Sequence, residues 1–230
     1  SGTGGDAAME TRHANRASTE RTSEQPAYGI AEAARYLRLP AATLRSWIVG
    51  RNYATADRPR RFQPLIRPPR NRPPTLSFLN LIEAHVLRAL RTQHGVSVQN
   101  LRSALHYAET RLGIGRLLLS PELRSEGGQI FLDRYGALIN LSASGQLAMR
   151  KLLEQHLERV ELDEVRVPIR LYPFLSFEVD VRSRPIAIDR RIAFGRPIVA
   201  SKGVSTHAIV ERIDAGEAPG DVAQDYDIDL

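Results

Sequence analysis

The sequence has 230 residues, a formal net charge of +6 and no cysteine. This length is sufficient for one or two domains, each with a hydrophobic core of its own. The lack of cysteine excludes disulfide frameworks, thiolate zinc sites and cysteine nucleophiles. No apolar run approaches the roughly 20 residues that span a bilayer, and no signal sequence is visible, so we expect a cytoplasmic protein with no membrane partner.

The positive charge is almost entirely arginine, because Lys151 and Lys202 are the only lysines. Arginine binds phosphate groups in a bidentate manner, which favours a nucleic-acid partner. An arginine-rich codon usage explains the same composition equally well. The positions of the arginines along the chain must therefore decide between the two.

The patterns along the chain predict a mainly α fold with small β elements (α+β). Residues 1–26 predict a disordered tail, and its opening SGTGGDAA resembles a cloning remnant. Residues 27–66 predict a winged helix-turn-helix head, and the proline-dense residues 67–75 a stiff connector that is neither helix nor central strand. Residues 76–164 predict a helical scaffold for dimerisation, and residues 165–230 a small domain of strands followed by a helix pair.

Two short helices are predicted in the head, since apolar residues recur there at helical spacing. The first has an apolar stripe of Ile30, Ala33, Ala34 and Leu37, and Leu39-Pro40 ends it. The second covers residues 41–49, buries Leu44, Trp47 and Ile48, and directs outward Thr43, Arg45 and Ser46. A helix pair joined by a tight turn can place its second helix in a DNA major groove.

An arginine-rich stretch follows the second helix. Seven arginines lie between positions 51 and 72, against one acid, Asp57. Such a concentration of charge fits a polyanion, and the segment has the length of a two-stranded wing. The candidate DNA contacts therefore lie on the second helix and the wing: Thr43, Arg45, Ser46, Arg51, Arg58, Arg60 and Arg61. A plain helical hairpin with a solvated arginine loop is the alternative.

Residues 28–66 resemble the DNA-binding head of the MerR superfamily. The resemblance rests on Ile30, Ala33, Ala34 and Leu37 in the first helix and on Thr43-Leu44-Arg45-Ser46-Trp47 in the second. It implies that Arg45 contacts DNA bases or backbone, and that Arg60 and Arg61 contact phosphate. The chain departs from this superfamily after the wing, where MerR activators have one long coiled-coil helix.

The middle segment has the pattern of a scaffold. A helix from Phe78 is expected to end near Gly95, and Ser97 to cap a second helix, with its stripe at Leu101, Leu105, Ala108 and Leu112. QIFLD and GALINLS, residues 129–133 and 136–142, predict a β-hairpin. Residues 144–157 predict a further amphipathic helix through Leu147, Leu152 and Leu153.

Motifs of catalysis and metal binding do not occur in the sequence. None of the six histidines has HExxH spacing, and there is no GxSxG, P-loop or GxGxxG motif. We therefore expect no enzyme activity, no cofactor and no metal site.

The C-terminal residues predict two strands and two helices. PIAID and RPIVA are β-branched runs that suit neighbouring strands. Ser205 or Thr206 begins a helix that ends at Gly216, with Ala208, Ile209 and Ile213 directed inward. Pro219 begins a second helix that buries Val222, Ala223 and Tyr226. The outer positions are acidic, which suits a protein partner or the chain's own arginines: Glu211, Asp214, Glu217, Asp221 and Asp225.

The same stretch resembles domain of unknown function 433, which occurs in VapB-type antitoxins encoded beside PIN-domain ribonuclease toxins. The matching positions are Ile186, Ile188, Asp189, Gly195, Arg196, Pro197, Gly203, Ile209, Ala215, Gly216, Glu217, Val222, Ala223, Asp225 and Tyr226. The resemblance implies an antitoxin of a type II toxin-antitoxin system. Such a protein binds a metal-dependent PIN ribonuclease and, as a homodimer on operator DNA, represses its own operon.

The usual VapB device for inhibition is an arginine inserted among the toxin's carboxylates, and Arg184, Arg190 and Arg191 are candidates for it on charge alone. Exposed loop arginines without such a role are an equal alternative. Two other functions stay open. One is a stand-alone MerR-like transcriptional regulator whose C-terminal half binds a ligand or a partner, and the other is an architectural DNA-binding factor of the excisionase type.

Overall fold

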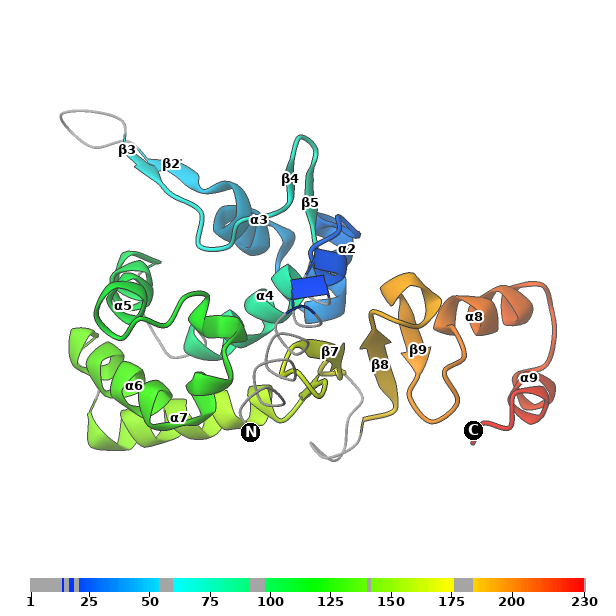
Figure 1. Ribbon diagram of the computed structural model, residues 1–230. Helices are drawn as coiled ribbons and strands as arrows, with labels where there is room; N and C mark the ends of the chain where they lie inside the picture. Colours follow the sequence, from blue (N-terminus) through cyan, green and yellow to red (C-terminus); the bar gives the residue numbers. More distant parts are fainter. Residues whose placement is uncertain are drawn as a thin grey trace, which may run out of the picture. The chain divides into compact units, whose positions relative to one another are not determined.

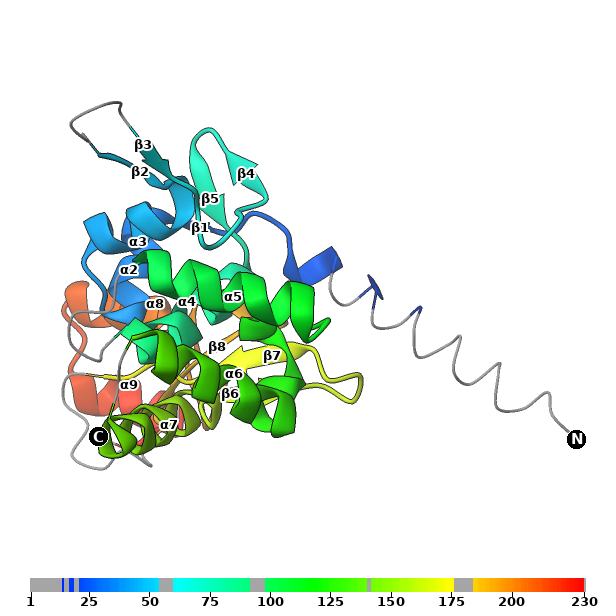
Figure 2. The same cartoon turned by 90° about the vertical axis from the view of Figure 1, so that its left-hand side faces the viewer.

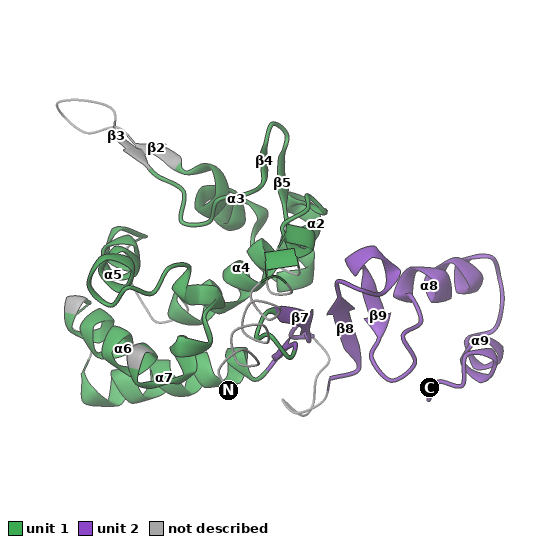
Figure 3. Ribbon diagram, in the orientation of Figure 1, with its two compact units in different colours: residues 1–158, 164–167 green, residues 159–163, 168–230 purple. Residues whose placement is uncertain are grey.

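The computed structural model describes residues 14, 17–18, 21–53, 60–91, 98–139, 142–175 and 184–229. The chain forms two compact units, coloured separately in Figure 3: unit 1 comprises residues 1–158 and 164–167, and unit 2 comprises residues 159–163 and 168–230. The predicted class, mainly α with small antiparallel sheets, is confirmed. No helix within the described ranges combines the length and the apolar character needed to cross a membrane.

The head of unit 1 consists of strand β1 (Tyr28–Gly29) and helices α2 (Ile30–Leu37) and α3 (Ala41–Val49) (Figure 1). The predicted buried faces are confirmed, with Ile30, Ala33, Ala34 and Leu37 on α2 and Leu44, Trp47 and Ile48 on α3. Helix α2 ends where Arg38 adopts the left-handed conformation, with φ of 52°. These two helices form the predicted helix-turn-helix.

Two hairpins follow α3 and project from the same side of unit 1 in both Figure 1 and Figure 2. Strands β2 (Arg51–Tyr53) and β3 (Arg60–Phe62) form the predicted wing, an antiparallel pair in which Asn52 lies opposite Arg61. Strands β4 (Arg70–Asn71) and β5 (Pro74–Leu76) form the second hairpin, and β5 is the central strand of a sheet with the order β1-β5-β4.

The second hairpin corrects the prediction of a stiff connector at residues 67–75. Pro74 is the first residue of β5, a strand position that proline tolerates, and Pro73 lies in the turn. Thr75 then pairs with Gly29 on one side and with Arg70 on the other. The prolines of this stretch thus avoid the central ladder positions at which an amide donor is required.

Helix α4 (Phe78–Arg91) runs through the core of unit 1. Its first turn is closed by reciprocal hydrogen bonds: the Ser77 amide donates to Asn80 Oδ1 and the Asn80 amide to Ser77 Oγ, each at 3.1 Å. This is a capping box with asparagine in place of the usual glutamate. Helix α5 (Val98–Arg111) buries Leu101 and Ala108 as predicted. The predicted helix end at Gly95 and the cap at Ser97 lie outside the described residues.

The predicted β-hairpin at residues 129–142 is wrong, because helix α6 (Glu126–Leu138) occupies most of that stretch. Phe131, Leu132 and Tyr135 are buried on one side of α6, and the rings of Phe131 and Tyr135 stack with centroids 5.9 Å apart. A Cβ atom added at Gly128 would lie 2.1 Å from the Leu123 carbonyl oxygen, so the start of α6 approaches the preceding 3-10 turn closely. Tertiary packing has overridden the strand-like composition.

Helix α7 (Ala143–Leu157) is present, but its predicted apolar face is partly wrong. Leu147 is 66% exposed, while Met149, Leu153, His156 and Leu157 are buried. The buried face therefore begins later in the helix, where α7 packs against α4. There the His85 and His156 rings are 4.9 Å apart, and His85 Nε2 lies 2.9 Å from the His156 carbonyl oxygen.

Residues 1–26 differ from the predicted disordered tail where they are described. Residues 14, 17–18 and 21–23 are helical and Ser23 is buried. Glu24 forms an ion pair with Arg116 of the same unit. An ion pair thus connects this polar segment to the rest of unit 1, a contact that hydrophobic periodicity does not register.

Unit 2 is built on a four-stranded antiparallel sheet with the order β6 (Val160–Leu162), β7 (Pro168–Leu171), β8 (Ile186–Asp189) and β9 (Pro197–Val199). The predicted pairing of PIAID with RPIVA is confirmed, because β8 and β9 are neighbours and Ala187 lies opposite Ile198. These two residues form a small core with Tyr172. Helices α8 (Thr206–Asp214) and α9 (Pro219–Asp225) follow, as predicted.

The inward face predicted for the first of these helices is only partly right. Ala208 and Ile209 are half-buried, but Ile213 is 38% exposed, and no described residue of α8 is fully buried. Helix α8 packs against β9 and α9, which leaves the side carrying Val210 and Ile213 in contact with solvent. Val222 of α9 is buried as predicted.

Candidate nucleic-acid interface

The helix-turn-helix owes its close packing to small residues and a main-chain turn. Ala33 and Ala34 are both buried, and the Leu39 amide donates to the Ala34 carbonyl oxygen at 2.9 Å. At the same end of α2, Arg88 Nη1 donates to the Leu37 carbonyl oxygen at 2.8 Å. Burial, and secondarily the charge of Arg38, lowers the pKa of Arg88. A cation at a helix C-terminus is favourable, so Arg88 fixes α2 to α4.

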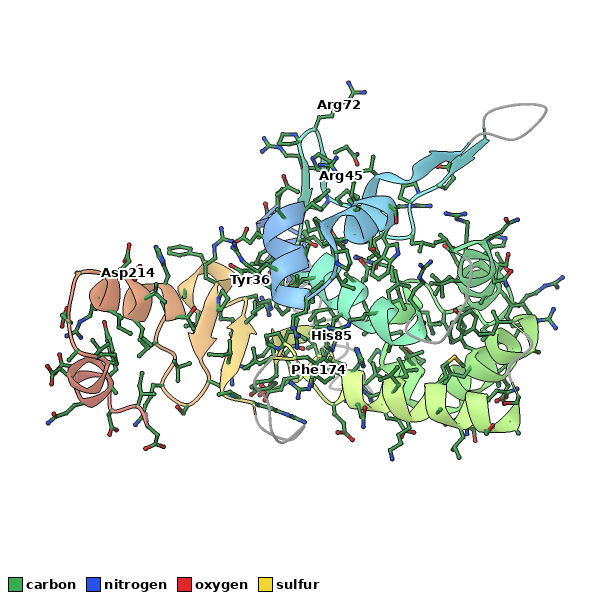
Figure 4. The ribbon with its side chains drawn as sticks, turned by 180° about the vertical axis from the view of Figure 1, so that it is seen from behind. Tyr36, Arg45, Arg72, His85, Phe174 and Asp214 are labelled. Atoms are coloured by element: carbon green, nitrogen blue, oxygen red, sulfur yellow. The ribbon has the colours of Figure 1, made fainter. Side chains whose placement is uncertain are left out.

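Helix α3 presents one long cationic side chain to solvent. Arg45 is exposed, whereas Thr43 and Ser46 are half-buried. The Ser46 hydroxyl donates to the Thr43 carbonyl oxygen at 2.7 Å, so its proton is engaged within the helix. Of the three candidates on this helix, Arg45 is therefore the best placed to reach a base edge or a phosphate (Figure 4).

The wing is attached to the recognition helix α3 through main-chain atoms. The amides of Leu65 and Ile66 both donate to the Trp47 carbonyl oxygen, at 2.8 and 3.1 Å, and the Ile66 side chain is buried. This fixes the position of the chain leaving β3 relative to α3.

The structure brings three of the four wing candidates into one antiparallel pair. Arg51 lies opposite Phe62, Arg60 opposite Tyr53, and Arg61 opposite Asn52. Arg58 lies outside the described residues. The predicted wing arginines are thus carried by a ribbon whose exit is fixed to α3.

The second hairpin adds cationic residues that the prediction had placed in a connector. Arg70 and Arg72 are exposed, and Figure 4 shows Arg72 at the tip of the β4–β5 hairpin. Asn71 and Pro73, which flank Arg72, are turn-forming residues and are the signal that could have indicated a hairpin. The candidate interface therefore comprises α3 and two neighbouring hairpins.

The arginines considered for toxin binding lie in unit 2, where each is engaged by neighbours of the same unit. Arg191 donates to both carboxylate oxygens of Asp189, at 3.1 and 3.0 Å, and Arg170 Nε donates to Asp189 Oδ2 at 2.9 Å. Burial acts to raise the pKa of Asp189, but the hydrogen bonds from Arg191 and Arg170 outweigh it and hold that pKa below its ordinary value.

The other two candidates differ in accessibility. The Arg190 side chain is 14% exposed and lies 3.8 Å from Asp163, and burial is the main cause that lowers its pKa. The guanidinium of Arg184 lies 5.4 Å from the centre of the Tyr172 ring. Sequence reasoning did not anticipate these partners, because Asp163 and Tyr172 directly follow β6 and β7 and lie far from the two arginines in sequence.

Helices α8 and α9 form an acidic surface, which we call the acidic helix pair. Residues 206–229 contain seven exposed carboxylates against one arginine, Arg212. Arg212 joins the two helices by donating to Glu217 Oε1 at 2.9 Å and to Asp225 Oδ2 at 2.7 Å. Asp214 lies at the C-terminal end of α8 (Figure 4).

Apolar side chains are also exposed in unit 2. Phe194 is 95% exposed and adopts a left-handed backbone conformation with φ of 54°, and Val210 on α8 is 50% exposed. Single exposed apolar side chains are common, whereas a contiguous patch of them is typical of surfaces that bind other proteins. Among the described residues, no group of three or more histidine, aspartate or glutamate side chains is placed to hold a metal ion.

Helices α2 and α3 and the wing give the head a winged helix-turn-helix fold, an architecture typical of DNA-binding domains. Residues 26–105 match the family described as "Putative DNA-binding HTH domain", a region that runs past the wing into α4 and α5. Residues 186–230 match the family described as "Protein of unknown function (DUF433)".

The chain is similar over most of its length to a protein of Mycobacterium tuberculosis named "Putative antitoxin VapB45". The two are 29% identical over 222 residues, which cover 88% of this chain and 89% of that protein. The predicted resemblance to VapB-type antitoxins, with a helix-turn-helix head and a DUF433 domain, is confirmed. The crystal structure of Rv2018 from Mycobacterium tuberculosis has the same fold, with a TM-score of 0.63 at 24% identity over 88% of this chain and 93% of that one.

Proposed function

We propose that this chain is a DNA-binding antitoxin without enzymatic activity. It neutralises a PIN-domain ribonuclease in the cytoplasm and, as a homodimer on operator DNA, represses its own operon. The observation that carries the proposal is the presence of a helix-turn-helix domain and a DUF433 domain in one chain, in a sequence similar to an antitoxin along most of its length.

On the DNA side, Arg45 of α3 enters the major groove, and the wing and the β4–β5 hairpin contact phosphates. The exposure of Arg45, Arg70 and Arg72 supports these roles. The wing arginines proposed for phosphate contact are Arg51, Arg58, Arg60 and Arg61. Thr43 and Ser46, which are half-buried on α3, contribute shorter contacts beside Arg45.

On the toxin side, the contact is made by unit 2. A ribonuclease needs a basic surface to bind RNA, and the acidic helix pair is complementary to such a surface. Exposed Phe194, Val210 and Ile213 supply apolar contact area. Arg184 and Arg191 remain accessible to a partner, whereas Arg190 is largely enclosed and supports Asp163 instead.

The experiment is co-expression of the full chain with the PIN-domain protein encoded beside it. We expect co-purification and rescue of growth, both weakened by Phe194→Ala. Leu147→Ala is the matched control, because it removes an exposed apolar side chain from unit 1. Co-purification and rescue that fail with the unaltered chain would refute the antitoxin role, and equal loss in both variants would refute the placement of the toxin on unit 2.

A further inference from the structure

The solvent-facing side of helix α3 carries two alanines beside its one long cationic side chain. The exposed residues of this helix are Ala41, Ala42 and Arg45. The DNA contacts assigned above all come from polar or charged side chains, so neither alanine has a role in them. An alanine at the surface of a recognition helix can nevertheless read a base, through its methyl group.

Ala42 points away from the core of the head. Leu44 is 0% exposed and lies two residues later, which is about 200° around a helix with about 3.6 residues per turn. Ala41 lies three residues before Leu44, only about 60° from it around the helix, so its methyl group lies at the flank. Ala42 is therefore at the centre of the solvent-facing side, whereas Ala41 is at its edge.

Arg45 shares this side of the helix with Ala42, because residues three apart are neighbours on a helix surface. A helical side chain leans toward the N-terminus and covers the preceding turn, so Arg45 extends over the turn that contains Ala42. The two Cα atoms are separated by about 4.5 Å along the helix axis, and successive base pairs of DNA by about 3.4 Å. The two side chains can thus reach bases within about two base pairs of each other.

The start of a recognition helix is the part that contacts base edges in the major groove. A side chain as short as that of alanine lets the helix backbone come close to the bases. Its methyl group has no hydrogen-bonding atom, so it gains most from an apolar group in the groove, and that group is the C5-methyl of thymine. Arginine favours guanine, whose O6 and N7 accept two hydrogen bonds from one guanidinium group.

We infer that Ala42 is a specificity-determining residue whose methyl group contacts the C5-methyl group of a thymine. Arg45 binds a guanine within about two base pairs of that thymine. The inference rests on the proposed operator binding, which it deepens by naming the bases that the head selects.

The test compares two duplexes that contain the promoter of the operon. One contains thymine, and the other contains uracil in its place, which lacks the C5-methyl group and keeps the same base pairing. We expect the full chain to bind the uracil duplex about fourfold more weakly for each bound head, the factor that corresponds to one lost methyl contact. Fluorescence anisotropy measures both affinities at one fixed salt concentration, because phosphate contacts make them depend on salt.

Glycine substitutions assign the effect to one residue. Ala42→Gly should bind the two duplexes equally, because the methyl group on the protein is gone. Ala41→Gly is the matched control, the same substitution at the edge of the same helix turn, and should keep the preference for thymine. A thymine preference that persists in Ala42→Gly would overturn the inference, since the effect would then come from the shape or stiffness of the DNA.

A second pair of variants keeps the test valid if glycine disturbs α3. Ala42 and Ala31 are both exposed and each is the second residue of its helix, where glutamate is a good helix former and favourable beside the helix dipole. Ala42→Glu should lower the promoter affinity about tenfold or more, because its carboxylate is placed against the negatively charged DNA, and Ala31→Glu should lower it much less. Equal loss in both variants would contradict the placement of Ala42 at the bases.

Single base replacements locate the two contacts. Uracil is exchanged for one thymine at a time, and 7-deazaguanine, which lacks N7, for one guanine at a time. The sensitive thymine and guanine should lie within about two base pairs of each other, and the guanine effect should disappear in Arg45→Ala. Sensitive bases that lie further apart would overturn the joint reading by Ala42 and Arg45.

The same duplexes separate this inference from the proposed function. Equal binding of promoter and random duplexes by the unaltered chain would overturn both the proposed operator binding and the role of Ala42. A clear preference for the promoter that does not change with uracil would overturn the role of Ala42 alone.

Discussion

Two substitutions of the buried Trp47 test how the head is stabilised. Trp47 of α3 is 1% exposed, and its Nε1 is buried without a hydrogen-bond partner among the residues that the structure describes. Trp47→Ala leaves a large cavity and should lower the free energy of unfolding by about 3–5 kcal/mol. Trp47→Phe leaves a cavity of only a few tens of Å³. Each Å³ of cavity costs about 24 cal/mol of stability, so the free energy of unfolding falls by about 1 kcal/mol.

The phenylalanine variant also removes the unsatisfied N–H group, whose burial costs about 1–3 kcal/mol. We therefore expect Trp47→Phe to be neutral or slightly stabilising, several kcal/mol better than Trp47→Ala. Urea unfolding followed by circular dichroism at 222 nm measures both, because each variant lacks the only tryptophan of the chain. If Trp47→Phe proves as destabilising as Trp47→Ala, the indole N–H has a partner and the reasoning is refuted.

Three further predictions concern the two surfaces and the sheet of unit 2. Arg45→Ala should reduce discrimination between operator and random DNA, while Arg72→Ala should weaken both alike and lower the slope of log K against log salt by about 0.9, as measured by fluorescence anisotropy. Asp189→Asn should cost about 2–3 kcal/mol at neutral pH, since it leaves the half-exposed Arg191 without its carboxylate and Arg170 with only the longer pair to Glu161. Phe194→Gly should raise the free energy of unfolding by about 1 kcal/mol, because glycine adopts a φ of 54° without strain and the lost ring is 95% exposed.

The lowered pKa of Asp189 also predicts how the stability of unit 2 changes with pH. The folded-state pKa of Asp189 lies below the unfolded value, so its ion pairs stabilise the fold above the ordinary carboxyl range, and this contribution is lost as the pH falls through the lowered pKa. Acid unfolding followed by circular dichroism should therefore be less steep in Asp189→Asn than in the control Asp221→Asn, whose side chain is exposed. Equal acid sensitivity of the two variants contradicts the prediction.

Controls for the other two predictions use the same measurements. Equal loss of operator and random DNA binding in Arg45→Ala would place that side chain on phosphate rather than on a base. A lower unfolding free energy in Phe194→Gly would mean that the ring packs within unit 2. Phe194→Ala separates the two contributions of that residue, because it removes the ring and keeps the backbone strain.

The head and the β8–β9 pair could be predicted because their signals are local. The apolar spacing in α2 and α3 can be recognised from residues that are close together in the sequence. The same holds for the β-branched runs in β8 and β9. The turn residues of the second hairpin give a local signal, but its place in a sheet could not be found in this way, because β5 pairs with β1, more than 40 residues earlier in the chain. The arginines of this hairpin are evident in the sequence, but their position in the candidate DNA interface is not.

Helix α6 was mispredicted for a different reason, because its local composition favours strands. QIFLD has strand-like composition, yet Phe131 and Tyr135 are one helical turn apart and are buried together in unit 1. The partner of Arg190 was hidden for a similar reason, since Asp163 meets it only once the sheet has formed, whereas the contact of Arg191 with Asp189 is local to one turn. Patterns along the chain identify many helices and strands and their exposed faces. Tertiary packing decides which residues contact their buried faces.

The hydrogen bonds at the Trp47 carbonyl oxygen have a consequence for how such heads diverge. Both donors, Leu65 and Ile66, are main-chain amides, so no particular side chain is required to hold the wing in position against α3. Replacement of exposed residues such as Arg45 on α3 can therefore alter which DNA is preferred, and replacement of the hairpin arginines how tightly DNA is bound, while the frame that presents them is kept. A chain of this design can acquire a new operator through a few surface substitutions, without refolding its head and without touching the unit assigned to the toxin.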